Sequence, residues 1–194
     1  MESTVKAEKQ ALRAIIRKGR KALTKEQYEV ATNGLTQNLK EICRLLEVQT
    51  ISCYLSSPTE PNTRPFINWA IEQGINVLLP ISREDGLLDW VVANNEGETI
   101  GLFGMPEAIG NLLGPIAVND ADLMIIPAAS VGKDGMRMGW GKGYFDKTIG
   151  SMANKPPIYA VVFENEIFDY VPSTQFDEPI SGAVTESKIH RFER

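Results

Sequence analysis

A short run at residues 122–126, apolar except for its first residue, ends at Pro127 and leads into a glycine-rich segment at 135–146. Such a run is typical of a strand that is buried on both faces of a parallel sheet. Open sheets of this kind bind ligands beyond the carboxyl ends of their strands. The glycine-rich segment therefore stands where a ligand site is expected.

Strands and helices are predicted to alternate along the rest of the chain. Strands are predicted at residues 49–55, 75–80, 87–92, 158–163 and 180–184, and helices at 4–22, 25–46, 64–73 and about 143–151. Thr24 and Gln27 form a capping-box pattern for the second helix, and Gly74 ends the third. We expect a long ordered connection at 93–120. The alternation predicts an α/β fold with a largely parallel sheet.

The segment from Gly135 to Asp146 carries the groups needed to hold a polyphosphate. Glycines at 139, 141 and 143 let the backbone turn tightly and bring its N–H groups against a ligand. Arg137 and Lys142 add positive charge, and Asp146 is a carboxylate suited to Mg²⁺. The spacing matches neither a Walker A loop nor Gly-x-Gly-x-x-Gly. An ordinary glycine-rich turn with solvated charges is the alternative.

The predicted N-terminal helix carries a stripe of positive charge beside an apolar face. The stripe consists of Lys6, Lys9, Arg13, Arg17 and Arg20, and the apolar face of Ala11, Leu12, Ile15, Ala22 and Leu23. Like charges at spacings of three and four repel one another, and Glu2 is the only acidic residue that lies on the stripe. A bound anion and a plain basic surface both explain the stripe.

Charge and composition exclude several classes of function. Residues 1–25 carry eight Lys and Arg against two Glu, a net charge of +6, which leaves −11 for residues 26–194. No broad basic surface is left for a nucleic-acid backbone, and no apolar run is long enough for a membrane span. Cys43 and Cys53 are the only cysteines and indicate core roles in a reducing compartment. We therefore expect a cytoplasmic protein without nucleic-acid or membrane partners; the oligomeric state stays open, with a monomer favoured.

His190 is the only histidine, and it lies in a charged tail. This excludes mechanisms of the Ser-His-Asp and Cys-His types and any site with several histidine ligands. Phosphoryl transfer fits better, because it depends on positioning and electrostatic stabilisation more than on covalent help from the protein.

These motifs resemble the 5-formyltetrahydrofolate cyclo-ligases, also called 5,10-methenyltetrahydrofolate synthetases. The family signature Arg-Leu-Gly-x-Gly-x-Gly-Tyr-Tyr-Asp stands here as Arg137-Met138-Gly139-Trp140-Gly141-Lys142-Gly143-Tyr144-Phe145-Asp146. Further matches follow the family order along nearly the whole chain: Lys9 and Arg13, Glu60 and Thr63, Pro80, Met105-Pro106-Glu107, residues 122–127, Asp177, and Thr185-Glu186.

The resemblance implies a three-layer α-β-α sandwich, of the kind shared with ribose-5-phosphate isomerase and CoA transferases. Residues 1–194 would form one cyclo-ligase-like domain, with a helical pair at 1–46 packed on it. The implied reaction is the cyclisation of 5-formyltetrahydrofolate to 5,10-methenyltetrahydrofolate with ATP and Mg²⁺. The formyl oxygen attacks ATP, folate N10 closes the ring, and ADP and phosphate are released.

The resemblance also implies roles for individual residues. Catalysis falls to Arg137 and Lys142, and ATP binding to Lys9, Arg13, Arg137, Gly139, Gly141, Lys142, Gly143 and Tyr144. Leu55, Glu60 and Tyr144 would contact the folate, and Asp146 and Asp177 would bind Mg²⁺. Structural roles are the alternatives: Glu60 as a helix cap, Tyr144 in the core and Asp177 at the turn before Pro179.

The sequence departs from the family pattern at three places. Gly132 stands where a carboxylate is usual, Phe145 replaces a tyrosine and Phe176 replaces a histidine. A non-catalytic nucleotide- or folate-binding homologue is therefore one alternative. A second is an enzyme of the same fold that acts on a sugar phosphate or a CoA thioester, with Glu60 as its candidate catalytic group.

Overall fold

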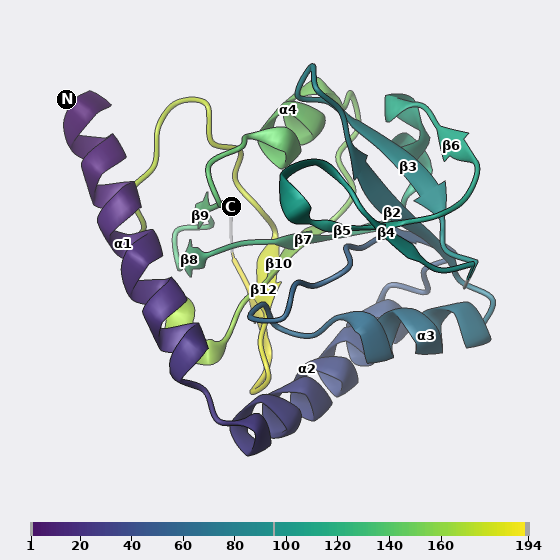
Figure 1. Cartoon of the computed structure of the whole chain (residues 1–194), viewed down its shortest axis with the longest axis horizontal. Coiled ribbons are helices and arrows are strands. Elements are labelled where there is room, and N and C mark those ends of the chain that lie inside the picture. The colour runs from purple at the N-terminus through teal and green to yellow at the C-terminus, as the bar shows by residue number, and fades with distance from the viewer. Residues whose placement is uncertain (1, 95, 193–194) are drawn as a thin grey trace.

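The computed structural model describes residues 2–94 and 96–192 (Figure 1). Its centre is a sheet of eight strands: β1 (Thr50–Ser52), β2 (Asn76–Ser82), β3 (Leu88–Val92), β6 (Leu112–Leu113), β7 (Leu123–Pro127), β10 (Ile158–Val161), β12 (Gly182–Val184) and β13 (Ile189–Arg191). The spatial order is β13-β12-β10-β7-β1-β2-β3-β6. The strands from β12 to β2 in this order are parallel, and the pairings of β13, β3 and β6 are antiparallel. The predicted α/β fold with a largely parallel sheet is confirmed.

Strand β7 shows why the sheet is covered on both faces. Leu123 and Ile125 pack into a core with α2 (Lys25–Leu45) and α3 (Arg64–Glu72). Met124 and Ile126 point to the other face and pack with α4 (Tyr144–Ser151) and the 3-10 helix η2 (Pro115–Asp120). All four side chains are fully buried, and each contributes about 1.5–3 kcal/mol by leaving water. Two cores on opposite faces give the three layers that the resemblance implied.

Helix α1 (Glu2–Ala22) lies outside these layers, against a small sheet (Figure 1). This sheet contains β8 (Ser130–Gly132), β9 (Arg137–Met138) and β11 (Ile167–Phe168) in the order β11-β8-β9. Of the α1 side chains that the structure describes, at residues 4–22, only Ile16 and Arg20 are buried. The predicted apolar face is therefore buried only in part: Leu12 packs on the small sheet, whereas Ile15 is 65% exposed. The reason is that α1 meets its small sheet along a narrow line and not across a broad core.

Several short elements were not predicted. The connection at 93–120 contains β6, η2, the 3-10 turn η1 (Leu102–Gly104), and a hairpin of β4 (Glu98–Ile100) and β5 (Pro106–Ala108). The small sheet and β13 were missed as well, and the strand expected at 49–55 is limited to Thr50–Ser52. Strands of two or three residues are too short to show a period, and long-range pairing stabilises them.

The structure confirms the helix signals predicted at Thr24 and Gly74. The hydroxyl of Thr24 accepts a hydrogen bond from the Gln27 amide (3.2 Å), and the Gln27 side chain accepts one from the Thr24 amide (2.9 Å). Gly74 follows α3 with a φ of +75°, a conformation that glycine adopts without strain. Within the described residues, no helix is long and apolar enough to cross a bilayer.

Both cysteines lie in the main core as free thiols, as predicted. Burial raises the pKa of Cys43 and of Cys53 to about 12. Because the thiolate is the reactive form, we expect neither cysteine to react with Ellman's reagent in the folded protein near pH 8. Both should react in guanidinium chloride. Rapid labelling of the native protein would contradict this packing.

Candidate active site

The glycine loop turns the chain from β9 into α4. Gly141 and Gly143 have φ values of +97° and +73°, which residues with a side chain rarely adopt. Gly143 occupies the N-cap position of α4, so the loop ends at the amino terminus of that helix. Arg137 lies in β9, before the loop, and its side chain is 2% exposed.

Helix α1 reaches this loop from a distant part of the chain. The Arg13 Nε donates a hydrogen bond to the Gly139 carbonyl (2.8 Å). A Cβ on Gly141 would lie 3.3 Å from Arg13 Nη1, so the guanidinium lies directly against this glycine. Burial, together with neighbouring Arg17, lowers the pKa of Arg13. The structure thus brings the predicted ATP contacts of α1 and of the loop together.

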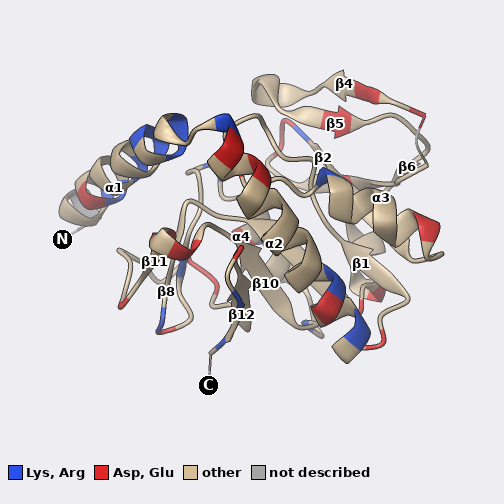
Figure 2. Cartoon of the chain, turned by 90° about the horizontal axis from the view of Figure 1, so that it is seen from below, with Lys and Arg blue, Asp and Glu red and all other residues tan. Residues whose placement is uncertain are grey.

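The basic stripe of α1 is not without acidic partners, which corrects the expectation from local sequence. Figure 2 shows Lys and Arg along this helix. Lys9 Nζ forms an ion pair with Asp177 Oδ2 at 2.5 Å. Arg20 forms a second ion pair, with Glu166. These partners follow the positions of Lys9 and Arg20 by 168 and 146 residues, so local sequence could not show them.

Arg137 pairs with Asp146 beneath the loop. Arg137 Nη2 donates to Asp146 Oδ1 at 2.8 Å, and the same oxygen accepts the Glu178 amide at 3.3 Å. Burial lowers the pKa of the Arg137 guanidinium, and Asp146 and Asp177 oppose that effect. The Nε of Arg137 is buried and has no hydrogen-bond partner among the described residues. A buried cationic donor without a partner fits an anion that binds here.

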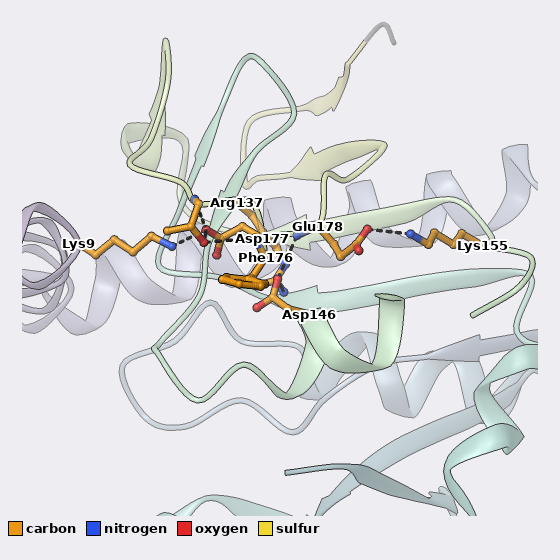
Figure 3. A network of polar contacts seen from close by, with 8 residues as sticks. Lys9, Arg137, Asp146, Lys155, Phe176, Asp177 and Glu178 are labelled. Atoms are coloured by element: carbon orange, nitrogen blue, oxygen red, sulfur yellow. Dashed lines mark hydrogen bonds and ion pairs between the residues drawn. The ribbon is translucent and has the colours of Figure 1, made fainter. Parts of the chain in front are cut away.

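Figure 3 shows that Lys9, Arg137, Asp146 and Asp177 lie in one network of polar contacts. The Asp177 carboxylate also accepts hydrogen bonds from the amide and the hydroxyl of Thr174, at 2.6 and 2.9 Å. Burial by itself would raise the pKa of Asp177, but Lys9 and Thr174 outweigh it and lower the pKa. Asp177 therefore holds its own loop as well as Lys9.

The two acidic residues fit a magnesium ion that arrives with a phosphate better than a metal site made by protein alone. No cluster of three or more His, Cys, Asp or Glu among the described residues could hold a metal. Mg²⁺ usually takes one or two carboxylates together with phosphate oxygens. Asp146 Oδ2 accepts no hydrogen bond from the described part of the chain, although Oδ1 is engaged. The metal-binding roles of Asp146 and Asp177 stay predictions.

Lys142 and Tyr144 both face the tip of the β4–β5 hairpin. Lys142 Nζ lies 3.7 Å from the centroid of the Phe103 ring, and the Tyr144 ring lies 6.3 Å from it. Tyr144 also donates its hydroxyl to the Arg83 carbonyl (2.6 Å), so it is not a simple core residue. Phe103 was missed by sequence reasoning, and its φ of +62° is uncommon for a residue with a side chain.

A groove of about 560 Å³ lies between the loop after β1 and the same hairpin. Its lining comprises Tyr28, Ser56, Ser57, Pro58, Asn62, Arg64, Glu98, Thr99, Ile100, Gly104 and Pro106. Leu55 and Glu60 flank this lining without joining it. Leu55 packs on the main core, and Glu60 is 4% exposed. The Glu60 carboxylate accepts the Ser57 amide (2.9 Å), so it shapes the loop instead of capping α3.

Packing accounts for two of the departures from the family pattern. A Cβ on Gly132 would lie 3.0 Å from the Tyr170 Cα and 3.1 Å from the Val171 nitrogen. The chain after β11 therefore occupies the space that a side chain would need. Phe145 packs against the core on the α4 face, where its ring needs no hydroxyl.

Trp140 is a second residue that sequence reasoning missed, because it fills a variable position of the signature. Its ring centroid lies 5.0 Å from the Arg17 guanidinium and 5.1 Å from that of Arg20. Arginine over the face of tryptophan is a favourable cation–π contact. The signal in the sequence that could have pointed to this contact was an aromatic residue inside the loop together with the basic stripe of the N-terminal helix.

Comparisons with known proteins identify the family of this chain. A model of the 5-formyltetrahydrofolate cyclo-ligase family matches residues 5–186. The 5-formyltetrahydrofolate cyclo-ligase of Mycolicibacterium smegmatis is 28% identical over 142 residues, which are 71% of this chain and 73% of that protein. Its counterpart from Haemophilus influenzae is 26% identical over 176 residues, 89% of this chain and 94% of the relative.

A solved structure shows the same fold. The NMR structure of the Aquifex aeolicus 5,10-methenyltetrahydrofolate synthetase matches with a TM-score of 0.80 at 22% identity, and the match covers 96% of this chain and 93% of that one. The family match includes both the α1 cations and the glycine loop. The chain therefore belongs to the 5-formyltetrahydrofolate cyclo-ligase family of enzymes.

Proposed function

We propose that this enzyme uses Mg²⁺ and ATP to cyclise 5-formyltetrahydrofolate to 5,10-methenyltetrahydrofolate. The observation that carries the proposal is the convergence of α1 on the glycine loop, where Arg13 hydrogen-bonds Gly139 and Lys9 pairs with Asp177. Residues from Lys9 to Asp177 contribute to one site, which supports a single domain over residues 1–194.

The ATP phosphates bind at the glycine loop. Left-handed glycines at 141 and 143 allow close approach of a ligand to the backbone, and α4 begins at the end of the loop. Arg13 and Arg137 supply positive charge beside Gly139, because a Cβ there would lie 2.9 Å from Arg137 Nη1. Lys142 exchanges its contact with the Phe103 ring for a phosphate oxygen when the nucleotide binds.

The reaction joins the folate formyl oxygen to the terminal phosphorus and breaks the bond between that phosphorus and ADP. Folate N10 then attacks the activated formyl carbon and loses its proton. The bond between that carbon and the formyl oxygen breaks, and the oxygen leaves as part of inorganic phosphate, which takes up the proton. Arg137 and Lys142 act here because negative charge on the transferring group is what they can neutralise. Mg²⁺ held by Asp146 and Asp177 would neutralise phosphate oxygens in the same step.

The folate binds in the groove between the loop after β1 and the β4–β5 hairpin. Leu55 and Glu60 flank this groove and shape its wall, and Gly104 lines it next to Phe103. Phe103 and Tyr144 connect the groove to the glycine loop, which supports transfer between two ligands bound side by side.

The competing functions fit less well. CoA transfer would need Glu60 as an accessible nucleophile, yet its carboxylate is buried and accepts the Ser57 amide. Gly132 and Phe145 suggested a non-catalytic homologue, but packing explains both residues: a side chain at 132 would meet the backbone at 170–171, and the Phe145 ring packs on the core. Arg137 and Asp146 form an ion pair beside the glycine loop, and Lys142 is retained within that loop.

The direct test is the absorbance of the methenyl product. Purified protein with 5-formyltetrahydrofolate should form this product only when both ATP and Mg²⁺ are supplied. Product that forms equally well without ATP would contradict the phosphoryl-transfer mechanism. Folate binding without any product would favour the non-catalytic homologue.

Lys9 and Arg13 provide a test of the nucleotide site. Replacing either by alanine should weaken ATP binding by about 1–3 kcal/mol, the effect of losing a charged hydrogen bond. Isothermal titration with a non-hydrolysable ATP analogue measures this directly. Lys18→Ala is the matched control, because Lys18 is an exposed cation of the same helix. Unchanged ATP affinity in both Lys9→Ala and Arg13→Ala would contradict the assignment of these residues as ATP contacts.

Asp146→Asn and Asp177→Asn test the metal sites. Each change keeps the side-chain volume and removes the charge, so the Mg²⁺ concentration for half-maximal activity should rise, by about tenfold for Asp146. The effect of Asp177→Asn should be weaker. Circular dichroism checks that the fold is intact. Wild-type dependence on Mg²⁺ in both variants would mean that ATP alone holds the metal.

A further inference from the structure

Arg20 is the one charged side chain of α1 that is buried among residues 4–22, at 5% exposure. Its Nε and Nη2 donate to the two carboxylate oxygens of Glu166 at 2.7 and 2.8 Å. Nη2 also donates to the Ala128 carbonyl at 2.9 Å. Such a two-point pair has one geometry, so it sets direction as well as distance.

The partners of Arg20 belong to the carboxyl ends of two central strands. Ala128 follows β7 directly. Glu166 ends the 3-10 turn η3 (Glu164–Glu166) after β10, and its second oxygen accepts the Phe163 amide at 2.9 Å. Arg20 therefore ties α1 to the most buried part of the sheet. Burial by itself would lower the pKa of Arg20, but hydrogen bonding to Glu166 outweighs it and raises the pKa.

Apolar packing alone fixes the position of α1 only weakly. Ile16 is the one apolar side chain of α1 that is buried within residues 4–22, and Leu12 is partly buried beside it. Two apolar contacts within a helix of 21 residues leave its axial position and rotation weakly defined. A directional ion pair fixes both.

Arg20 lies on the same side of α1 as the two predicted ATP contacts. It follows Arg13 by seven residues and Lys9 by eleven, close to two and three whole turns at about 3.6 residues per turn. A shift of α1 at Arg20 therefore moves Lys9 and Arg13 relative to the glycine loop. Trp140 adds a second connection, since its ring contacts both Arg20 and Arg17 from inside that loop.

We propose that the Arg20–Glu166 ion pair is a positioning device for the nucleotide site. It sets the axial position and rotation of α1, so that Lys9 and Arg13 meet the phosphates held by the glycine loop. This inference rests on the proposed function, because it assigns the α1 cations to ATP. Arg20 does not touch the substrate; it acts through the helix that carries the contacts.

The test replaces the pair by apolar residues. Removing one partner leaves a buried charge and destabilises the fold, whereas replacing both by apolar residues of similar size is often neutral for stability. The variant is therefore Arg20→Met with Glu166→Leu. Because the Ala128 carbonyl and the Phe163 amide also lose these partners, we expect a somewhat lower melting temperature in a protein that still folds. Its affinity for a non-hydrolysable ATP analogue with Mg²⁺ should be lower by about tenfold or more. The KM for 5-formyltetrahydrofolate should stay within about twofold.

Two further variants make the result specific. Lys18→Met is the matched control: it removes an exposed cation of the same helix that lies outside the basic stripe, and ATP affinity should be unchanged. Arg20→Lys keeps the charge but cannot form the two-point pair, so ATP affinity should fall while the protein remains folded. This variant decides the question if the double variant does not fold.

The outcomes separate this inference from the proposed function. If the wild type forms product without ATP, the proposed function fails. If the wild type needs ATP, but Arg20→Lys and the folded double variant bind the ATP analogue as the wild type does, the ion pair is merely structural and the inference is overturned. An equal loss of ATP and folate affinity would also overturn it, because a general loss of structure affects both ligands.

Discussion

Burial of the central strands on both faces is the constraint from which the rest of the structure follows. Helices α2 and α3 cover one face of the sheet, and α4 with η2 covers the other. The edge at which the parallel strands end is therefore where a ligand can bind. The loops after β1, β7 and β10 all emerge there. They provide the groove wall at residues 56–58, the carbonyl of Ala128 and the turn of Glu166.

Helix α1 illustrates a different way of holding an element in place. The other helices are attached by apolar surface, whereas the described contacts of α1 are polar at three points along its length: Lys9 to Asp177, Arg13 to Gly139, and Arg20 to Glu166. The free energy of an ion pair or a charged hydrogen bond depends more steeply on distance and angle than the free energy of apolar burial does. The helix that carries the two proposed phosphate contacts is thus held in place by directional polar contacts.

The hairpin of β4 and β5 connects the two halves of the proposed site. Phe103 at its tip contacts Lys142 of the glycine loop, and the next residue, Gly104, lines the groove proposed for folate. Movement of the hairpin would therefore change the surroundings of both proposed ligand sites. The positive φ of Phe103 is consistent with a tip whose shape serves contact with the loop.

Local sequence by itself determined the elements whose signals are local: the capping box of Thr24, the end of α3 at Gly74 and the doubly buried strand β7. The signature from Arg137 to Asp146 likewise located the glycine loop. Tertiary structure decided everything that depends on residues far apart in the chain, including the burial of Arg20, the partners of Lys9 and the contacts of Trp140. The physical reason is that the charge and periodicity of a segment describe its own surface, whereas an ion pair across 168 positions exists only after the sheet has brought both ends of the chain together.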